Sequence, residues 1–370
     1  MENRDKIRVL VIDDSVVMRH AISKLINCDD IEVIETACNG KEGVEKAISL
    51  HPDVITMDIE MPVMNGIEAL REIMHNQPIP VIMVSTLTTE GADATLEALS
   101  IGAVDFITKR AALREIDSMK DELISKIISI GKNNNLKNQL IRKRLLRKIK
   151  SERKELISEI EPHERKEDNN FKNLKNRTRP NFKDISVIII GISTGGPNAL
   201  HELLTKLPEN LTSPILIAQH MPPYFTKSLA QRLNSFCKLN VKEAEDNEYV
   251  RAGFVYIAPG GKQMKLTRHN KIEIIEEYEE QLYHPSVDVL LNSAINSVGN
   301  NTLAIMMTGM GNDGSTAMKH LSDIGGYILV QDPETCIVSG MVGAEIKLGA
   351  ADEILSINGI ADAIINISSN

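Results

Sequence analysis

Three residues that can cooperate in nucleophilic catalysis each follow an apolar stretch of the sequence. Ser193 follows VIII within GISTGGP, His220 follows ILIAQ, and Asp313 follows TLAIMM within TGMGNDGS. Buried parallel strands project the turns at their carboxyl ends onto one edge of a sheet, where residues distant in sequence meet. A serine nucleophile, a histidine base and an orienting aspartate form the set that acyl transfer requires. The spacing therefore predicts a Ser-His-Asp site.

Each of these residues also has a simpler structural interpretation. GISTG fits the pattern G-x-S-x-G, but Ser193 or Thr194 could be a helix cap, and a glycine-rich turn could bind phosphate. His220 could be a satisfied core histidine, and Asp313 could form an Asx turn. The chain order Ser, His, Asp also differs from that of α/β-hydrolases, in which the acid precedes the histidine. The combination at three strand ends is what favours catalysis.

A second group of polar residues marks strand ends in the first 130 residues. Asp13 and Asp14 follow IRVLVI, Asp58 ends VITMD, Ser85 ends PVIMVS and Lys109 follows VDFIT. Three carboxylates at one sheet edge repel one another, and Mg²⁺ is a hard cation suited to neutralise them. Asp58 could accept a phosphoryl group as an aspartyl phosphate, near a hydroxyl and a lysine. Aspartates at strand ends can be helix caps, but five such residues together favour a function.

Two regions of alternating strands and helices must position these groups. Between Ile7 and Ile107 five apolar strands alternate with amphipathic helices, and a fifth helix is expected over 111–130. The same rhythm resumes at Asp184, with a β-hairpin insertion expected over 241–275. The pattern predicts an α/β protein with two doubly wound parallel sheets, one flavodoxin-like and one Rossmann-like. The expected domains are 1–130 and 184–370.

The stretch between these domains has its own charge. Residues 131–183 hold 17 Lys or Arg and 7 Asp or Glu, whereas the rest of the chain holds 25 basic and 44 acidic residues. Apolar residues recur at roughly helical spacing from Leu140 to Ile160. We expect a basic, partly helical linker that extends the fifth helix and continues as a disordered tether. The alternative is a basic patch that binds nucleic acid or lipid.

Composition excludes several classes of protein. The chain of 370 residues has no Trp and 3% aromatic residues, which argues against base-stacking nucleic-acid platforms. Its four cysteines show no metal-binding or CxxC spacing, and we expect reduced thiols. We find no signal peptide and no apolar run long enough to cross a bilayer. We therefore expect a cytoplasmic monomer that neither binds nucleic acid nor inserts into a membrane.

The first domain resembles the receiver domain of bacterial two-component response regulators. The resemblance covers about residues 5–125 and rests on VIDDS, VITMDIEMPVMNG, VIMVSTLT and GAVDFITK. It implies that a chemotaxis histidine kinase phosphorylates Asp58 while Asp13, Asp14 and Asp58 hold Mg²⁺. It also implies that Ser85, Lys109 and the switch aromatic Phe106 sense the phosphate. One departure is Arg110, which stands where that family usually has proline after the lysine.

The second domain resembles the catalytic domain of the chemotaxis protein-glutamate methylesterases, the CheB family. The resemblance covers about residues 184–368 and rests on GISTGGP, AQHMPP, SVDVLLNSA and TGMGNDGS. It implies phosphorylation-regulated hydrolysis of glutamate γ-methyl esters on the cytoplasmic domains of chemoreceptors, and in many members glutamine deamidation. Ser193 would be the nucleophile, His220 the base and Asp313 its orienting partner, with no cofactor for this step. The backbone amides of Thr194 and Met310 are the candidates for the oxyanion hole.

Two other classes of function remain as alternatives. The second domain could be a signalling adaptor that binds without hydrolysis, although Ser193, His220 and Asp313 are all present. The chain could also be a DNA-binding response regulator, which would require a helix-turn-helix with a basic recognition face. The acidic second domain, with its glycine turns after strands, argues against that function.

Overall fold

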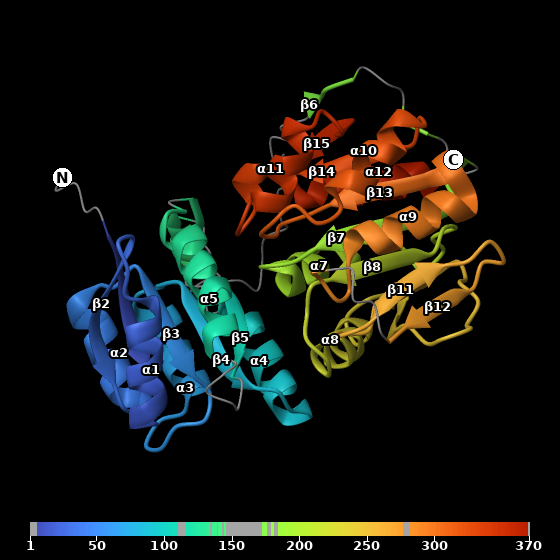
Figure 1. The fold of residues 1–370 in the computed structure, drawn as a ribbon. Coiled ribbons are helices and arrows are strands. Elements are labelled where there is room, and N and C mark those ends of the chain that lie inside the picture. The colour runs from blue at the N-terminus through green and yellow to red at the C-terminus, as the bar shows by residue number, and fades with distance from the viewer. Residues whose placement is uncertain are drawn as a thin grey trace, which may run out of the picture. The chain divides into compact units, whose positions relative to one another are not determined.

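The fold comes from a computed structural model of the chain. Described are residues 6–109, 116–133, 135–138, 140–142, 144–145, 172–175, 179–180, 184–276 and 282–368. The chain divides into two compact units, Met1–Asp168 and Asn169–Asn370. Figure 1 shows that each unit contains a sheet flanked by helices.

The first unit is built on a five-stranded parallel sheet with the order β2-β1-β3-β4-β5. Its strands are β1 (Ile7–Ile12), β2 (Ile31–Ala37), β3 (Val54–Asp58), β4 (Val81–Thr86) and β5 (Asp105–Lys109). The three central strands are buried along most of their length, which explains why they are continuous apolar runs. The strand order reverses direction at β1, so the ends of β1 and β3 flank the switch point of the sheet. The predicted sheet is confirmed.

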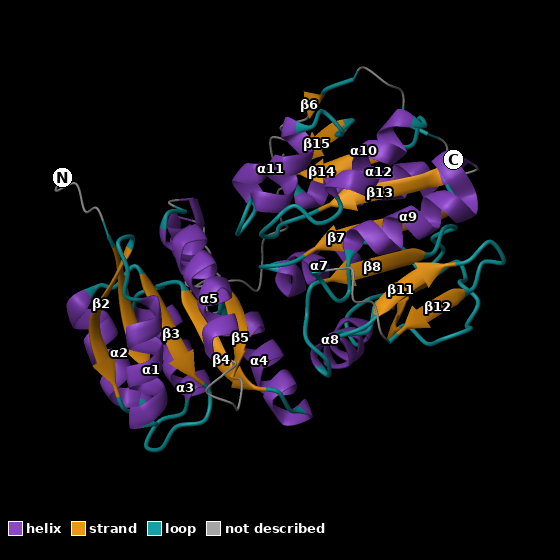
Figure 2. Cartoon of the chain, in the orientation of Figure 1, coloured by secondary structure: helices purple, strands orange, loops and turns teal. Residues whose placement is uncertain are grey.

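Short polar side chains begin the first four helices of this unit. Ser15, Asn39, Asn65 and Thr88 each accept a hydrogen bond from a backbone amide of the first turn, as N-cap residues do. The helices are α1 (Val16–Ile26), α2 (Gly40–Leu50), α3 (Gly66–Asn76), α4 (Thr89–Ile101) and α5 (Ile116–Gly131). Each connects two strands or follows the last one (Figure 2). These caps therefore fix where the loops at the carboxyl edge end.

The second unit is built on an eight-stranded sheet with the order β6-β15-β14-β13-β7-β8-β10-β9. Seven strands are parallel, and β6 is antiparallel to β15. The strands are β6 (Lys172–Asn173), β7 (Val187–Ile192), β8 (Ile215–Gln219), β9 (Asn240–Glu243), β10 (Phe254–Ile257), β13 (Thr302–Met306), β14 (Tyr327–Gln331) and β15 (Glu353–Leu355). The helices are α7 (Gly196–Leu204), α8 (Phe225–Asn234), α9 (Val287–Val298), α10 (Ser315–Asp323), α11 (Gly340–Lys347) and α12 (Ile357–Ser368). The second doubly wound sheet is thereby confirmed.

The predicted hairpin insertion is shorter than 241–275. The antiparallel pair consists of β11 (Gln263–Leu266) and β12 (Ile272–Ile275), which form a sheet of their own. The earlier part of that range instead contributes β9 and β10 to the main sheet, where both run parallel to their neighbours. Val255, Tyr256 and Ile257 are buried beside β8, so this apolar segment joins the core.

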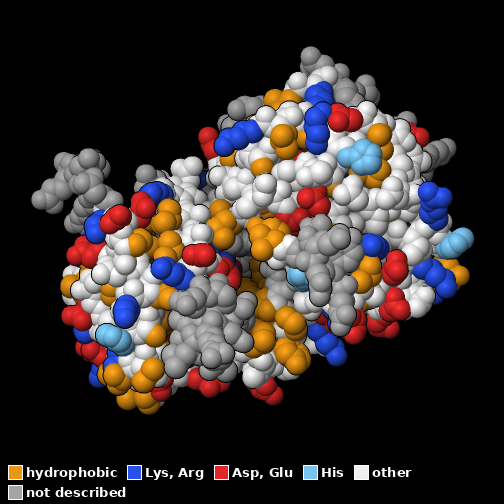
Figure 3. All heavy atoms as spheres, viewed as in Figure 1, with side chains coloured by type: hydrophobic (Ala, Val, Ile, Leu, Met, Phe, Trp, Pro, Cys, Tyr) orange, Lys and Arg blue, Asp and Glu red, His pale blue; other side chains and the backbone are white. Residues whose placement is uncertain are grey.

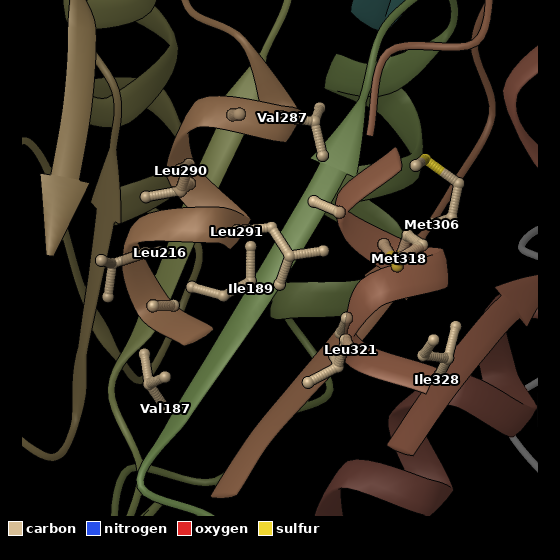
Figure 4. Close-up of a cluster of buried hydrophobic side chains, with 14 of the residues drawn as sticks. Val187, Ile189, Leu216, Val287, Leu290, Leu291, Met306, Met318, Leu321 and Ile328 are labelled. Atoms are coloured by element: carbon tan, nitrogen blue, oxygen red, sulfur yellow. The ribbon is translucent and has the colours of Figure 1, made fainter. Parts of the chain in front are cut away.

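The core of the second unit lies between the sheet and helices α9 and α10. Val187 and Ile189 of β7 belong to a buried cluster with Leu290 and Leu291 of α9 (Figure 4). Alternate residues of a strand point to opposite faces, so the intervening Ile188 faces the other helical layer. Both faces of β7 are thus covered, and this strand is a rigid support for the loop that follows it.

Part of the predicted linker belongs to the second unit. Strand β6 extends the sheet beside β15, and the amide of Leu174 donates to the carbonyl of Asp352 at 2.9 Å. Arg179 donates two hydrogen bonds to the fully buried carboxylate of Glu353, at 2.7 and 2.6 Å. The segment around these residues therefore closes one edge of the catalytic sheet.

The beginning of the linker also differs from the prediction. Helix α5 ends at Gly131 rather than continuing, and the side chain of Asn133 accepts from the amide of Leu136 at 3.0 Å. Residues 135–138, 140–142 and 144–145 are helical, so a new helical segment begins after a cap. Most of the predicted tether lies outside the described residues. No helix in the described part of the chain is both long and apolar enough to cross a membrane.

Candidate active site and phosphorylation site

The order of the strands brings the three predicted catalytic residues to one edge. Ser193 follows β7, His220 follows β8 and Asp313 lies in the loop after β13, and these strands are neighbours in the order β13-β7-β8. The amide of His220 donates to the carbonyl of Ile192 at 3.1 Å. The histidine backbone therefore lies beside the residue that precedes Ser193.

Ser193 lies in a tight turn between β7 and α7. Gly195 has a φ of 79°, in the left-handed region that glycine adopts without a steric penalty. The Ser193 amide donates to the Thr308 carbonyl at 3.0 Å. At Gly309 a Cβ atom would lie 2.8 Å from the Cβ of Ser193, so the absence of a side chain lets the loop after β13 approach the serine. Ser193 itself is half-buried.

His220 and Asp313 form the central contact of the site. Nε2 of His220 lies 2.7 Å from Oδ2 of Asp313, and both side chains are largely buried, with 11% and 3% exposed. Because an ionised carboxylate only accepts hydrogen bonds, Nε2 carries the proton of the neutral imidazole. The other ring nitrogen, Nδ1, is buried and has no hydrogen-bond partner among the described residues. Nδ1 is therefore the nitrogen with a free lone pair.

Asp313 is held by the first turn of α9 as well as by His220. Its carboxylate accepts hydrogen bonds from the Ser286 hydroxyl at 2.8 Å, the Val287 amide at 2.6 Å and the Asp288 amide at 3.2 Å. Burial opposes ionisation, but the bonds from His220, Val287 and Ser286 hold the pKa of Asp313 below its ordinary value. Asp313 is therefore suited to remain charged while it orients the imidazole.

The predicted oxyanion donors are available. Among the described residues, the backbone amides of Thr194 and Met310 donate to no acceptor. Thr194 is buried, and its carbonyl accepts a hydrogen bond from the Thr308 hydroxyl at 3.0 Å. None of the described hydrogen bonds joins the Ser193 hydroxyl to His220. The backbone contacts thus join the turn of Ser193 to that of His220, whereas no hydrogen bond among the described residues links the serine hydroxyl to the imidazole.

Three further residues at this edge were not singled out from the sequence. Tyr283 stacks on the His220 ring, with ring centroids 4.4 Å apart and an interplanar angle of 6°. Gln219 donates to the carbonyls of Ser193 and His220 at 3.0 and 3.1 Å. Thr308 bridges the loops as described above. Gln219 and Thr308 stand inside the quoted AQH and TGMG segments, but no sequence signal points to the contact of Tyr283.

The edge of the first sheet brings together the predicted carboxylates. One oxygen each of Asp13, Asp14 and Asp58 lies within 4.8 Å of the others. Asp13 and Asp58 are buried, and Asp14 is exposed. The Lys109 ammonium lies 2.6 Å from Asp58 Oδ2 and 3.2 Å from Asp13 Oδ2. Burial, reinforced by the charge of Asp58, raises the pKa of Asp13 above its ordinary value although Lys109 opposes the shift.

These residues fit a magnesium ion. Oδ2 of Asp13 is buried and pairs with the Lys109 ammonium at 3.2 Å, but this one cation does not balance three grouped carboxylates, and such a group suits a hard divalent cation. Burial disfavours the charge on Lys109, but the hydrogen bond and charge of Asp58 raise its pKa overall. Lys109 therefore stays cationic beside the aspartate that would carry a phosphoryl group.

The remaining predicted receiver residues lie on the adjoining strands. Ser85 is buried on β4, and its hydroxyl donates to the Gly91 carbonyl at 3.1 Å. Phe106 on β5 is buried, and its carbonyl accepts a hydrogen bond from Lys126 at 2.7 Å. The sequence gave no reason to single out Lys126, which also pairs with Asp105 at 2.9 Å. Arg110 lies outside the described residues.

Both units match known families. Residues 188–364 match the CheB methylesterase family, and residues 9–120 match the response regulator receiver domain. A protein-glutamate methylesterase/protein-glutamine glutaminase from Archaeoglobus fulgidus is 43% identical over 362 residues, which cover 97% of each chain. A Vibrio cholerae protein-glutamate methylesterase/protein-glutamine glutaminase 1 is 42% identical over 375 residues, covering 97% of this chain and 98% of the other.

A crystal structure has a similar second unit. The catalytic domain of the Thermotoga maritima CheB methylesterase is 41% identical, covers 49% of this chain and 97% of its own, and gives a TM-score of 0.47. The assignment itself rests on the sequence relatives, which align with nearly the whole chain. The chain therefore belongs to the family of protein-glutamate methylesterases/protein-glutamine glutaminases that combine a receiver domain with a CheB methylesterase domain.

Proposed function

We propose that this chain hydrolyses glutamate γ-methyl esters on the cytoplasmic domains of chemotaxis receptors, with Ser193 as the nucleophile. The observation that carries the proposal is the 2.7 Å bond between His220 and the buried Asp313, next to the turn that holds Ser193. Family membership supports the substrate class, and the geometry supports the roles. We place this reaction in the cytoplasm, where those receptor segments lie.

The two ring nitrogens of His220 have different roles in the proposed reaction: Nε2 binds Asp313, and Nδ1 is the base. A serine hydroxyl changes its direction by rotation about one bond, and the proposed reaction requires a rotamer in which Oγ of Ser193 reaches Nδ1. As Oγ attacks the ester carbonyl, Nδ1 takes its proton, and Asp313 stabilises the imidazolium that forms. The proton on Nδ1 then passes to the departing methanol. Water attacks the acyl-enzyme in the second half, again with Nδ1 as the base, and releases the glutamate.

The carbonyl oxygen becomes negatively charged in both tetrahedral intermediates. The free amides of Thr194 and Met310 are the proposed donors to that oxygen. Removing one such donor typically costs 10²–10³ in kcat. Deamidation of glutamine follows the same steps with ammonia in place of methanol, and we propose it as a second activity on receptor glutamines.

The first unit would control this reaction through phosphorylation. A chemotaxis histidine kinase would transfer a phosphoryl group to Asp58, with Mg²⁺ held by Asp13, Asp14 and Asp58 to neutralise charge on the phosphoryl oxygens. Lys109 and the Ser85 hydroxyl would then contact the phosphate, and Phe106 would repack with them. We propose that phosphorylation of the first unit shifts its conformational equilibrium and thereby raises the rate of this hydrolysis.

DNA binding is a poorer explanation of the second unit. Helices α7 to α11 each lie between two strands of this unit, whereas a helix-turn-helix needs consecutive helices. On the face drawn in Figure 3, acidic and basic side chains are interspersed rather than gathered by sign. The acidic balance outside the linker also disfavours phosphate-backbone contacts. We therefore propose no nucleic-acid partner.

Methanol release from methylated receptor tests the proposal. The full chain is expected to release methanol, faster with Mg²⁺ and a small phosphodonor, and Ser193→Ala should abolish release while the fold is kept. Residual activity above about a hundredth of the wild-type kcat would contradict the nucleophile, because removing a nucleophile from such a set costs far more. A receptor-binding chain without hydrolysis would favour the adaptor alternative.

A further inference from the structure

The imidazole of His220 stacks on one aromatic ring, that of Tyr283, which has no role in the proposed reaction. The rings of Tyr283 and His220 are nearly parallel, at 6°, and their centroids lie 4.4 Å apart. Tyr283 is half-buried. Burial, with the charge of Asp313, raises its pKa, so the phenol stays neutral and keeps an electron-rich face. The face of this ring is therefore turned toward the catalytic base.

The stacking matters because the ring of His220 makes one side-chain hydrogen bond among the described residues. Nε2 is bound to Asp313, whereas Nδ1 has no hydrogen-bond partner among the described residues. The ring can still turn through a limited range about its Cβ–Cγ bond. Such a rotation would strain the bond to Asp313 and change the direction of Nδ1. A flat ring stacked on the imidazole opposes this rotation, and so fixes the plane in which Nδ1 lies.

Tyr283 is itself held from two sides. Its carbonyl accepts a hydrogen bond from Gln263 Nε2 at 2.6 Å, and Oε1 of the same buried glutamine accepts from the Ser286 amide at 2.8 Å. At Gly311 a Cβ atom would lie 2.7 Å from the Tyr283 hydroxyl, so the loop after β13 approaches the ring closely. Ser286 also donates to Asp313. One short segment therefore positions both groups that contact the imidazole.

The stacking of Tyr283 on His220 also affects the charged form of the imidazole. His220 becomes an imidazolium in each tetrahedral intermediate of the proposed reaction, and an aromatic face attracts a cation. Among the described residues, the titratable groups that hydrogen-bond to the imidazole or stack on it are Asp313 and Tyr283, and the Asp288 amide donates to Asp313. Asp313 contacts the imidazolium at Nε2, and Tyr283 is placed to stabilise it through the face of the ring.

We propose that Tyr283 is a positioning residue of the esterase, which holds the plane of the His220 ring and stabilises its protonated form. This inference rests on the proposed function of His220 as the base. It requires the aromatic ring and not the hydroxyl. Cation–π contacts are worth a factor of about two to thirty in an equilibrium or a rate.

The test compares three variants in the full chain. Tyr283→Leu removes the ring, Tyr283→Phe keeps it, and Phe236→Leu removes the ring beside a histidine outside the site, His201, which it contacts edge-on at 5.1 Å. We expect Tyr283→Leu to lower kcat for methanol release about two- to thirtyfold and to shift the acid limb of the pH–rate profile to lower pH. Tyr283→Phe should restore both, and Phe236→Leu should change neither.

A second measurement does not depend on activity. The pH midpoint of the His220 imidazole, followed by NMR, should fall in Tyr283→Leu and return in Tyr283→Phe. If the leucine variant unfolds, trifluorophenylalanine at position 283 keeps the shape, withdraws electron density and should lower the same midpoint. An unchanged midpoint and kcat in a folded variant would overturn the proposal. Wild-type protein without methanol release would instead contradict the proposed function, while the NMR midpoint would still decide the role of Tyr283.

Discussion

The two sheets of this chain place aspartates at equivalent edges but treat their charge in opposite ways. Asp13 and Asp313 are 1% and 6% exposed. Asp313 accepts hydrogen bonds from the Ser286 hydroxyl, two amides and His220, and its pKa is lowered. Asp13 lies beside another carboxylate, and burial, reinforced by the charge of Asp58, raises its pKa although Lys109 and the Ser15 amide oppose the shift. Burial alone therefore does not decide the charge of an aspartate; the donors around it do.

This difference matches what each edge has to do. At the esterase edge the carboxylate of Asp313 is satisfied, because His220 and the start of α9 supply its donors. The receiver edge is incomplete, because Lys109 is one cation shared by Asp13 and Asp58, and the carboxylate of Asp14 belongs to the same group. An edge of this kind gains from Mg²⁺ and a phosphoryl group, and so can respond to phosphorylation.

Exchanging one carboxylate for an amide at each edge should give the largest and most distinct effects. Asp313→Asn cannot accept from His220 in the same way and favours the wrong tautomer, so kcat for methanol release should fall by about 10⁴. Asp58→Asn should instead abolish acid-labile phosphate incorporation from a small phosphodonor and Mg²⁺, and with it the stimulation of methanol release. Undiminished labelling of Asp58→Asn, or less than a tenfold loss in Asp313→Asn, would break the comparison.

Most of the fold and the principal site residues could be predicted because their signals are local. A strand such as Val187–Ile192 is buried on both faces, so its residues are apolar without interruption. The polar residue that follows such a strand must lie at the carboxyl edge. Ser193, His220 and Asp58 were found in this way. In the second unit, the order β13-β7-β8 then brings together the strand ends that carry Asp313, Ser193 and His220.

The contacts that escaped prediction depend on the path of loops. Tyr283 reaches His220 from a segment 63 positions later in the chain, and no periodicity marks it. Strands β9 and β15 have four and three residues, too few to show a pattern. The basic composition around Arg179 is typical of a linker, yet its partner Glu353 lies far along the sequence on a buried strand. Only the folded chain reveals that pair.

The linker segment should therefore be needed for the stability of the second unit. Arg179→Met leaves the buried carboxylate of Glu353 with Tyr327 as a donor at 2.6 Å but without its cation. Because breaking a buried ion pair by removing one partner costs about 3–5 kcal/mol and Arg179 is partly exposed, we expect a loss of roughly 2–4 kcal/mol in the free energy of unfolding. Calorimetry of the full chain measures it.

Two controls separate this effect from general damage. Arg179→Met combined with Glu353→Gln should recover part of the loss, since the uncompensated charge is gone. A chain starting at Asn169 should be as stable as the second unit of the full protein, whereas one starting at Asp184 should not. Equal unfolding midpoints for the two truncated chains would show that β6 and Arg179 are dispensable.

The smallest expected effect is a change in stability on substitution of Glu345. It tests whether hydrogen-bond donors also determine the charge of a buried acid within the second unit. Glu345 on α11 is fully buried, accepts one hydrogen bond from the Ser315 hydroxyl at 2.8 Å, and has an oxygen without a partner among the described residues. Burial, with the charge of Asp288, raises its pKa to about 7. Glu345 thus resembles Asp13 of the receiver rather than nearby Asp313.

The pH dependence of stability follows from that direction. Between the ordinary pKa of 4.5 and about 7 the folded state binds more protons than the unfolded state, so stability falls as the pH rises through this window. Glu345→Gln keeps the bond to Ser315 and removes the ionisation. It should therefore stabilise the chain by roughly 1–3 kcal/mol at pH 8 and by less at pH 4.5. Unfolding midpoints at the two pH values, with the exposed Glu209→Gln as the control, measure the difference. A gain that is equal at both pH values would mean that Glu345 ionises normally, and the rule drawn from Asp13 and Asp313 would not extend to it.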